Sequence, residues 1–511
     1  MATTPPCLPQ RQQWYCTTST QSKSSWDSLP PEVCSMILEY VSQNYRCSSS
    51  AAAVCREWQL TIEKKNFTRL RLQCSRVEDL EDFERIVSPR RDLVTYIGLN
   101  LRLRSYTCRI CRQTESHYME AQNSHFAQKA VWRLLEILSS WNRADKGLTL
   151  ELSAQSPSDS KHWFQNCYFG VDDRDGIMIK RIGDPSRKNN RELHDPDHGW
   201  VEGQQLVKPD VSALLRLYER IEFRPFSHFF NPSKVDAVTT LVIRRHCRRR
   251  FVPDTLSELW RCFPRLEYII YEPWRLWDSE VQRYYDNNYG KLFGEYLPKG
   301  LKTLSVFEDT NEDYIDIVRK AESPYQVDSV RSPSHALSVA FAKKSVALEQ
   351  LSVAFMVDAN CFFAGCDPTW SWLNLKSLAL TSILLTRTAK DSEIFSLLQA
   401  AGKAALRMPS LQSMSLWNGR KGEACAFIYQ SLDGYRSITW RSTWDLEVEP
   451  YVVETWGRVA AENARSELRV EKQLLSSDII RSHGDAVHHL RLPHGVIDRE
   501  SLWQIRREHE K

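Results

Sequence analysis

Glycine is scarce in this sequence, at 18 of 511 residues. Loops that cradle a phosphate need glycine where the backbone approaches the ligand closely. The glycine-rich nucleotide motifs, the nucleophile-elbow motif, the zinc-protease motif and the kinase motifs are all absent. No apolar run approaches the roughly 18 residues of a membrane-spanning helix. We therefore assign no catalytic residue and no cofactor, and we expect no membrane partner.

The sequence also has little excess of charge. Lys and Arg total 68 and Asp and Glu total 64, so the formal net charge is +4. This near balance argues against a nucleic-acid partner. The 14 cysteines are scattered, and the N-terminal residues lack the pattern of a secretory signal. We interpret the cysteines as thiols of a reducing compartment: the cytoplasm, the nucleus or both.

Apolar material is plentiful, since 42% of the residues are hydrophobic and 11% are aromatic. This composition supports a large core. The length suggests about three domains or one long repeat array. Residues 1–24 have the character of a disordered tail, and the folded part is expected to begin near Trp26.

Residues 26–58 predict two or more short helices. Pro30 and Pro31 suit the first turn of a helix, and a second helical run begins near Ala51. Helices this short cannot bury their apolar surface alone, so they need a partner or the rest of the chain. The apolar stripe expected on the first helix, spaced i, i+3, i+4, i+7 and i+8, consists of Val33, Met36, Ile37, Tyr40 and Val41.

The two ends of this segment resemble the F-box motif, which opens with Leu-Pro and an acidic residue and closes with Val-Cys-basic-x-Trp. The resemblance implies that residues 25–66 form an F-box that binds a Skp-type adaptor and, through it, a cullin. From the residues alone, an amphipathic cap on a larger fold is the alternative. The implied adaptor-binding residues are Leu29, Pro30, Glu32, Val33, Ile37, Leu38, Val41, Val54, Cys55 and Trp58.

A second pattern runs through residues 67–511. The template hydrophobic-x-x-hydrophobic-x-hydrophobic recurs, and its alternating apolar residues suit half-buried strands. The copies begin at Phe67, Val94, Asp145, Val238, Leu266, Leu301, Leu348, Leu375, Leu411, Tyr435 and Val487. Helical patterns between them cover Phe126–Trp141, Thr255–Phe263, Glu393–Leu406 and Glu449–Leu475.

Alternating strands and helices predict an α/β fold, in the form of an irregular leucine-rich-repeat-like solenoid. Units of about 25–50 residues stack because none buries its apolar face alone. An open α/β sheet of another topology is the alternative. Five apolar pairs should then lie on adjacent, mostly parallel strands with helices on the outer side: Leu241/Ile243, Leu304/Val306, Leu351/Val353, Leu378/Leu380 and Met414/Leu416.

Residues 155–235 interrupt this alternation of strands and helices, and we predict that they form an insertion projecting from the solenoid. Asp172, Asp173 and Asp175 resemble part of a calcium loop, but Gly176 comes too early and no glutamate follows at the twelfth position. We interpret this stretch as the tip of a β-hairpin.

Three segments of the C-terminal region are similar to a large group of fungal proteins, in which an F-box precedes an uncharacterised repeat-like region. The resemblance implies architecture only. The segments are RRHCRRR from Arg244, PRLEYIIYEPWR from Pro264 and LKTLSVFEDTNEDY from Leu301.

Cys108 and Cys111 form a C-x-x-C pair, with His117 and His125 downstream. The gap of five residues is far below the roughly twelve of a two-Cys, two-His finger, and no second C-x-x-C completes a set. We therefore predict structural thiols and no metal. The pair His488–His489 falls in the last predicted strand, where the two side chains would face opposite ways.

The segments that follow the strands would line one rim of a solenoid, where loops vary without disturbing the stack. Tryptophan and arginine are frequent binding hot spots. The predicted target-binding residues are Arg244, Arg245, Trp274, Trp277, Glu308, Asp309, Trp417 and Trp444. The alternatives are that the tryptophans pack over the edges of the fold and that the basic cluster is a solvated or salt-bridged face.

These features predict a substrate-receptor subunit of a Skp–cullin–F-box ubiquitin ligase. Such a chain does no bond chemistry and contributes proximity between a protein target and the ligase. An interaction scaffold that acts through the repeats without a ligase is the second hypothesis. An unrecognised hydrolase with its residues in the long loops is the third. The sequence does not identify the target.

Overall fold

The computed structural model describes residue 26 and residues 29–42, 48–141, 147–170, 194–224, 233–321, 325–328, 330–432, 435–463, 468–493 and 496–508. They divide into two compact units, Met1–Thr68 and Arg69–Lys511, and we describe each unit by itself. The predicted tail at 1–24 and the predicted hairpin and calcium-loop residues at 172–176 lie outside the described residues.

The first unit contains three described helices: α1 (Pro31–Ser42), α2 (Ser48–Ala52) and α3 (Arg56–Thr68). Pro31 opens α1, where a missing N–H costs nothing. The rings of Trp26 and Trp58 pack with their centroids 4.9 Å apart. Among the described residues of the unit, the buried hydrophobic ones are Cys34, Leu38, Ala51 and Ile62, so the core that they form is small.

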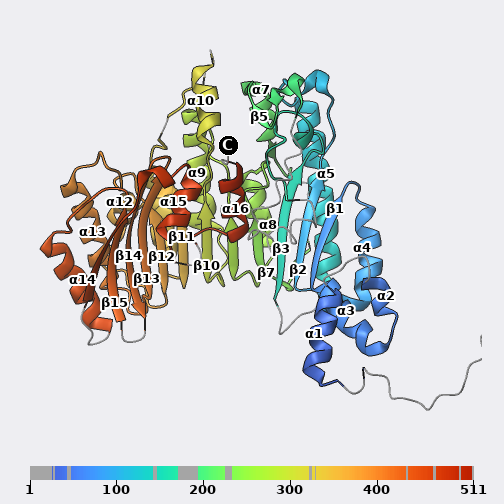
Figure 1. Ribbon diagram of the computed structural model, residues 1–511, viewed down its shortest axis with the longest axis horizontal. Coiled ribbons are helices and arrows are strands. Elements are labelled where there is room, and N and C mark those ends of the chain that lie inside the picture. The colour runs from blue at the N-terminus through green and yellow to red at the C-terminus, as the bar shows by residue number, and fades with distance from the viewer. Residues whose placement is uncertain are drawn as a thin grey trace, which may run out of the picture. The chain divides into compact units, whose positions relative to one another are not determined.

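The second unit is built on one large sheet. Each strand lies beside the next strand of that sheet along the chain, in the order β1-β2-β3-β7-β9-β10-β11-β12-β13-β14-β15-β16 (Figure 1). Its strands are β1 (Arg69–Cys74), β2 (Tyr96–Arg102), β3 (Leu148–Gln155), β7 (Val238–Ile243), β9 (Tyr268–Tyr271), β10 (Thr303–Phe307), β11 (Gln350–Asp358), β12 (Ser377–Thr381), β13 (Ser413–Arg420), β14 (Glu423–Leu432), β15 (Tyr435–Ser442) and β16 (Leu468–Leu474). Two short pairs stand apart from it: β4 (Trp200–Val201) with β5 (Gln204–Gln205), and β6 (Arg220–Ile221) with β8 (Arg250–Phe251).

The sheet is parallel except at β14, which runs antiparallel to both of its neighbours. The predicted placement of the five apolar pairs on adjacent strands of one sheet is confirmed, with β9 inserted between the first two. One in-register row across the central strands consists of Leu150, Leu241, Ile269, Leu304, Leu351, Leu378 and Met414. These residues are at most 1% exposed, as expected for a row of side chains on a covered face of the sheet.

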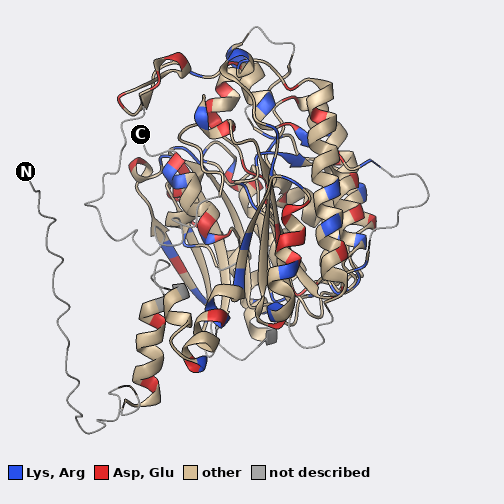
Figure 2. Cartoon of the chain, turned by 90° about the vertical axis from the view of Figure 1, so that its right-hand side faces the viewer, with Lys and Arg blue, Asp and Glu red and all other residues tan. Residues whose placement is uncertain are grey.

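Helices form a layer along one side of the sheet (Figure 2). Several begin at a polar residue that caps the first turn, such as Asp278 before α9 and Asn311 before α10. The helices of this unit are α4 (Asp79–Val87), α5 (His117–Ser139), α7 (Val211–Leu217), α8 (Pro253–Arg261), α9 (Ser279–Glu295), α10 (Glu312–Lys320), α11 (His335–Ser345), α12 (Ala359–Ala364), α13 (Asp391–Ala405), α14 (Pro450–Asn463), α15 (His483–Leu490) and α16 (Arg499–Glu508).

The C-terminal helices pack on the sheet itself. Helix α15 lies against β13 and β14, and a Cβ atom at Gly419 would come within 2.4 Å of the Ala486 Cβ atom. This position therefore requires glycine. Buried residues of this contact include Trp417, Ile428, Val487 and Ile505.

The predictions of local structure miss several elements, and three of the differences lie in the C-terminal part of the sheet and its helices. The segment from Val487 belongs to helix α15 and not to a strand, so His488–His489 lies on a helix. The long helix predicted over Glu449–Leu475 ends at Asn463 and is followed by strand β16. Strand β14 was not predicted, and it forms a hairpin with β13 through Gly422, whose φ is 76°. Among the described residues, no helix is both long and apolar enough to cross a membrane.

Candidate functional site

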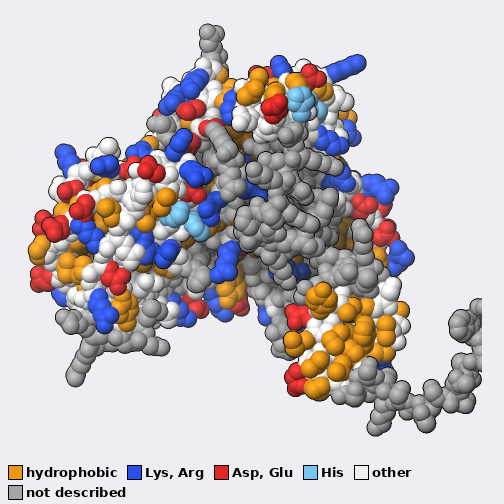
Figure 3. Space-filling view, viewed as in Figure 1, with side chains coloured by type: hydrophobic (Ala, Val, Ile, Leu, Met, Phe, Trp, Pro, Cys, Tyr) orange, Lys and Arg blue, Asp and Glu red, His pale blue; other side chains and the backbone are white. Residues whose placement is uncertain are grey.

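The first helix exposes an apolar face. Val33 is 37% exposed, Met36 is 68% exposed and Tyr40 is 78% exposed. Spacings of three and four residues place these side chains on one side of α1. Val54 and Leu60, each 61% exposed, add to the apolar surface of the unit. Figure 3 shows hydrophobic side chains gathered over these N-terminal helices.

The predicted adaptor-binding residues fall into three groups. Pro30, Glu32, Val33, Val54 and Cys55 are exposed, whereas Leu29, Ile37, Val41 and Trp58 are half-buried. Leu38 is only 2% exposed, because it belongs to the small core of the unit. We therefore reassign it from an adaptor-binding residue to a structural one. Met36 and Tyr40 were part of the predicted stripe, but they were not assigned to the binding face that they share with Val33.

The basic cluster after β7 is inside the second unit. The side chains of Arg245, Arg248 and Arg249 are each 1% exposed, and that of Arg244 is 11% exposed. An unpaired buried charge is very costly, so each of these arginines needs an acidic partner. The structure supplies those partners from distant parts of the chain.

Arg245 is the centre of this ion-pair cluster. It pairs with Asp309, and its Nη2 atom lies 2.8 Å from Glu508 Oε2. Asp309 Oδ1 lies 2.7 Å from His483 Nε2. Burial alone would raise the pKa of Asp309, but the charge of Arg245 and the hydrogen bond with His483 outweigh burial and lower it below its usual range. The carboxylate is therefore held in its charged form.

The other arginines are paired in the same way. Arg244 Nη1 lies 2.5 Å from Glu151 Oε2, and Arg248 Nη2 lies 2.5 Å from Glu508 Oε1. Arg249 Nη1 lies 3.1 Å from Glu115 Oε2. Similarly, Arg331 pairs with both Glu308 and Asp286 at 2.5 Å. The cluster thus joins the ends of several strands to the C-terminal helix α16.

The predicted target-binding tryptophans differ in exposure. Trp417 is fully buried, and Trp444 is 8% exposed beside Trp440, with ring centroids 6.0 Å apart. Trp274 and Trp277 are half-buried, and the ring of each lies 5.1 Å from that of Tyr218. These two tryptophans help to line a pocket, which also includes Arg248 and Tyr325.

These positions correct most of the predicted target site. Internal ion pairs occupy the side chains of Arg244, Arg245, Glu308 and Asp309. The rings of Trp417 and Trp444 are packed inside the unit, so all six residues are structural. The basic cluster is better described as a salt-bridged group. The two buried tryptophans are better described as packing residues of the fold. Trp274 and Trp277 are half-buried and retain surface that a partner can reach.

Glu272, beside the ion-pair cluster, should make the free energy of unfolding depend on pH. The pKa of its carboxyl is raised to about 7, mainly by burial and also by the charge of Asp498, although the hydrogen bond from Ser501 opposes both. Between about pH 4.5 and pH 7 the folded chain keeps this proton and the unfolded chain releases it. The free energy of unfolding should therefore fall as the pH rises through this window, by about 2–3 kcal/mol for this group.

The matched variant Glu272→Gln, which cannot ionise, isolates this effect. We expect the wild-type chain to lose about 2–3 kcal/mol more than Glu272→Gln when urea unfolding is compared at pH 5 and pH 8. A difference between the two proteins that does not change with pH would show that Glu272 does not titrate in this range.

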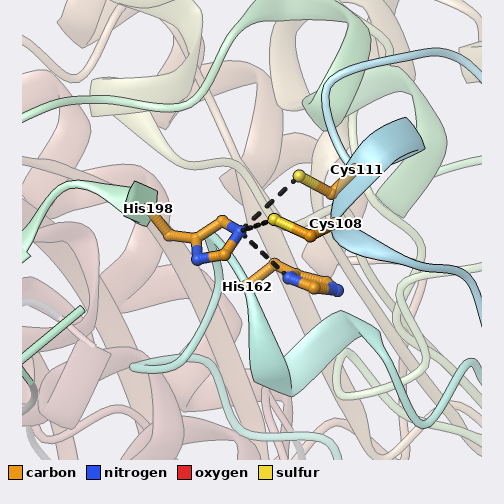
Figure 4. Close-up of side chains that lie close together, drawn as sticks. All are labelled: Cys108, Cys111, His162 and His198. Atoms are coloured by element: carbon orange, nitrogen blue, oxygen red, sulfur yellow. Dashed lines mark hydrogen bonds between the residues drawn. The ribbon is translucent and has the colours of Figure 1, made fainter. Parts of the chain in front are cut away.

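A cluster of cysteine and histidine side chains lies in the same unit (Figure 4). Cys108 begins the short 3-10 helix Cys108–Ile110 after β2, and Cys111 follows it. His162 follows β3, and His198 ends the 3-10 helix Pro196–His198. The ligand atoms of these four residues all lie within 4.8 Å of one another. Donor atoms of this kind suit a metal ion.

The two histidines that were weighed beside the C-x-x-C pair, and set aside, lie elsewhere in the structure. His117 and His125 are exposed on α5 and do not belong to the group. His162 and His198 were not considered, because they lie far along the chain from Cys111. The interpretation of Cys108 and Cys111 as thiols without a metal does not account for the two imidazoles that the fold brings to them.

Comparison with protein-family models gives a match in the C-terminal part of the chain. A family model described as "Family of unknown function (DUF6546)" matches residues 296–498, which is less than half of the chain. The match lies within the second unit, and it includes neither helices α1–α3 nor the cysteine–histidine cluster. No curated protein matches the sequence.

Proposed function

We propose that this chain is a substrate-receptor subunit of a Skp–cullin–F-box ubiquitin ligase. Helices α1–α3 would bind the Skp-type adaptor as an F-box, and the second unit would hold a protein target. The resemblance of residues 26–58 to the F-box motif motivates the proposal. The observation that carries it is the exposed apolar face of Val33, Met36 and Tyr40.

An exposed apolar face on a small helical unit favours a protein partner. Single exposed apolar residues are ordinary, but a contiguous group marks an interaction surface. Met36 and Tyr40 remain mostly exposed although the unit has buried its own core around Leu38 and Ile62. Docking of this face on an apolar groove of the adaptor would desolvate it, at about 1.5–3 kcal/mol for each fully buried side chain.

The second unit supports the receptor half of the proposal. Each strand of its large sheet lies beside the next one along the chain, as in a leucine-rich-repeat-like solenoid. We place the target contact at Trp274 and Trp277, since these half-buried rings line a pocket next to Arg248. Aromatic side chains in such positions are frequent binding hot spots.

Adaptor binding by the full chain tests the proposal. Met36→Asp places a charge in the centre of the apolar face and should weaken binding of a purified Skp-type adaptor by about tenfold to a hundredfold, measured as Kd by calorimetry. Met36 is 68% exposed, so the substitution should leave the fold intact.

Ser35→Asp is the matched control, because it adds the same charge at an exposed position on a different side of α1. It should bind with nearly the wild-type Kd. If the wild-type chain does not bind the adaptor, the scaffold hypothesis replaces the ligase. If the two variants bind equally well, this face of α1 is not the adaptor site.

A further inference from the structure

We propose that Cys108, Cys111, His162 and His198 bind one structural Zn²⁺ ion. Three of the short interatomic distances in the cluster share one atom, His198 Nε2. It lies 3.2 Å from Cys108 Sγ, 3.6 Å from Cys111 Sγ and 3.0 Å from His162 Nδ1 (Figure 4). The four side chains come from three separate segments of the chain, yet they point at a common centre.

These separations fit the edges of a tetrahedral zinc site. Zinc binds cysteine sulfur at about 2.3 Å and histidine nitrogen at about 2.0–2.1 Å, so neighbouring ligand atoms lie roughly 3.3–3.8 Å apart. The three observed distances of 3.0–3.6 Å lie in or just below that range. Because all four ligand atoms lie within 4.8 Å of one another, the widest edge would close by roughly 1 Å.

Hydrogen bonding alone does not account for this arrangement. His198 Nδ1 lies 2.7 Å from Asp195 Oδ2, and a carboxylate can only accept from it. In the neutral imidazole the proton is therefore on Nδ1, which leaves Nε2 with one lone pair directed at the cluster. Two thiols and a second imidazole cannot all donate to that lone pair, whereas one cation satisfies the four ligands together.

The surroundings of the cluster also match a metal site. Zinc-binding histidines usually donate their other N–H to a carboxylate that fixes the ring, as Asp195 does for His198. Asp195 is held in turn by Gln165, whose Nε2 donates to it at 2.7 Å. Two thiolates and two imidazoles in a tetrahedron favour Zn²⁺ over harder divalent ions. Four protein ligands leave no open position, which indicates a structural ion.

The ion would tie the insertion to the end of the sheet. Cys108 and Cys111 follow β2, His162 follows β3, and His198 precedes the β4–β5 pair. Trp163 packs edge-on against His198 at 5.6 Å, and it belongs to the same apolar cluster as Tyr218. Tyr218 in turn contacts the half-buried rings of Trp274 and Trp277. Zinc would thus support one wall of the pocket, whatever the pocket binds.

Metal content of the purified full chain tests the proposal. After reconstitution with one equivalent of Zn²⁺ and gel filtration, the wild-type chain should retain about one zinc per chain by mass spectrometry. The double variant Cys108→Ser with His162→Ala should retain at least about tenfold less. Both positions are accessible enough to tolerate the change, since Cys108 is exposed and His162 is half-buried.

Two control variants separate this site from the other thiols and histidines. Cys361→Ser removes a half-buried thiol outside the cluster, and His117→Ala removes the histidine next to the C-x-x-C pair in sequence. Both should keep the wild-type zinc content. Retention of zinc by the double variant, or its loss from His117→Ala, would overturn the assignment of ligands.

Two measurements on the wild-type chain need no substitution. Co²⁺ in place of Zn²⁺ should give the strong visible absorption of tetrahedral cobalt with a thiolate charge-transfer band. Removal of metal by a chelator should lower the Tm, and Zn²⁺ but not Mg²⁺ should restore it. A reconstituted chain that retains no zinc, or a Tm that neither chelator nor Zn²⁺ changes, would refute the proposal.

Discussion

Replacement of Arg245 by methionine should lower the free energy of unfolding of the second unit by about 3–5 kcal/mol. The guanidinium is 1% exposed and is shared between Asp309 and Glu508, which are themselves buried. Methionine fills part of the same space but leaves both carboxylates with one cation fewer. Asp309 then keeps His483 and Glu508 keeps Arg248. Urea unfolding followed by tryptophan fluorescence measures the loss.

The same substitution at a surface ion pair is the matched control. Arg319 Nη2 lies 2.7 Å from Asp316 Oδ1, but these side chains are 49% and 48% exposed. Arg319→Met should therefore cost no more than about 1 kcal/mol. Addition of Asp309→Asn to Arg245→Met should recover part of the larger loss, because it removes a buried carboxylate that has lost its arginine. Equal costs for Arg245→Met and Arg319→Met would show that the buried cluster does not support the fold.

The strands could be predicted from the sequence because burial of one face leaves apolar residues at alternating positions. Leu304 and Val306 illustrate this, since they occupy the same two positions of the template as Leu351 and Val353, and the two pairs lie in register. Parallel strands of this kind also need a crossover, and helical patterns were visible in four of these connections. The order of the strands then follows from the preference of consecutive units for adjacent positions.

The errors in the predicted secondary structure arise where the helical and the strand periodicity both fit the same residues. Val487 and Leu490 are three apart, which suits one face of a helix as well as the strand template. Ser482, whose side chain accepts a hydrogen bond from the Asp485 N–H, is a helix-start signal that favours α15. Similarly, the residues of β16 are mostly exposed, so this edge strand lacks the apolar signature of the central ones.

The ion pairs and the zinc ligands could not be predicted in full, because their partners are set by tertiary structure alone. Arg245 and Glu508 are 263 positions apart, and no local pattern joins them. The C-x-x-C pair was visible in the sequence, but His198 lies 90 positions from Cys108. Only the fold brings these residues together. The exposed face of α1 was more accessible to prediction, because helical spacing alone groups Val33, Met36 and Tyr40.

Trp417→Ala should lower the free energy of unfolding of the second unit by about 3–5 kcal/mol. The ring is fully buried beneath α15, with the Phe355 ring 5.2 Å away and edge-on, and with Ile428 and Val487 in the same cluster. Removal of the indole would leave a cavity that the sheet cannot close, because the backbone of β13 is paired on both sides. The midpoint of urea unfolding measures the loss. Leu373→Ala is the control, because this side chain is 66% exposed. It should lower the free energy of unfolding by no more than about 0.5 kcal/mol. A Trp417→Ala chain as stable as the control would mean that α15 does not pack on the sheet as described, and it would return Trp417 to the residues that a target can contact.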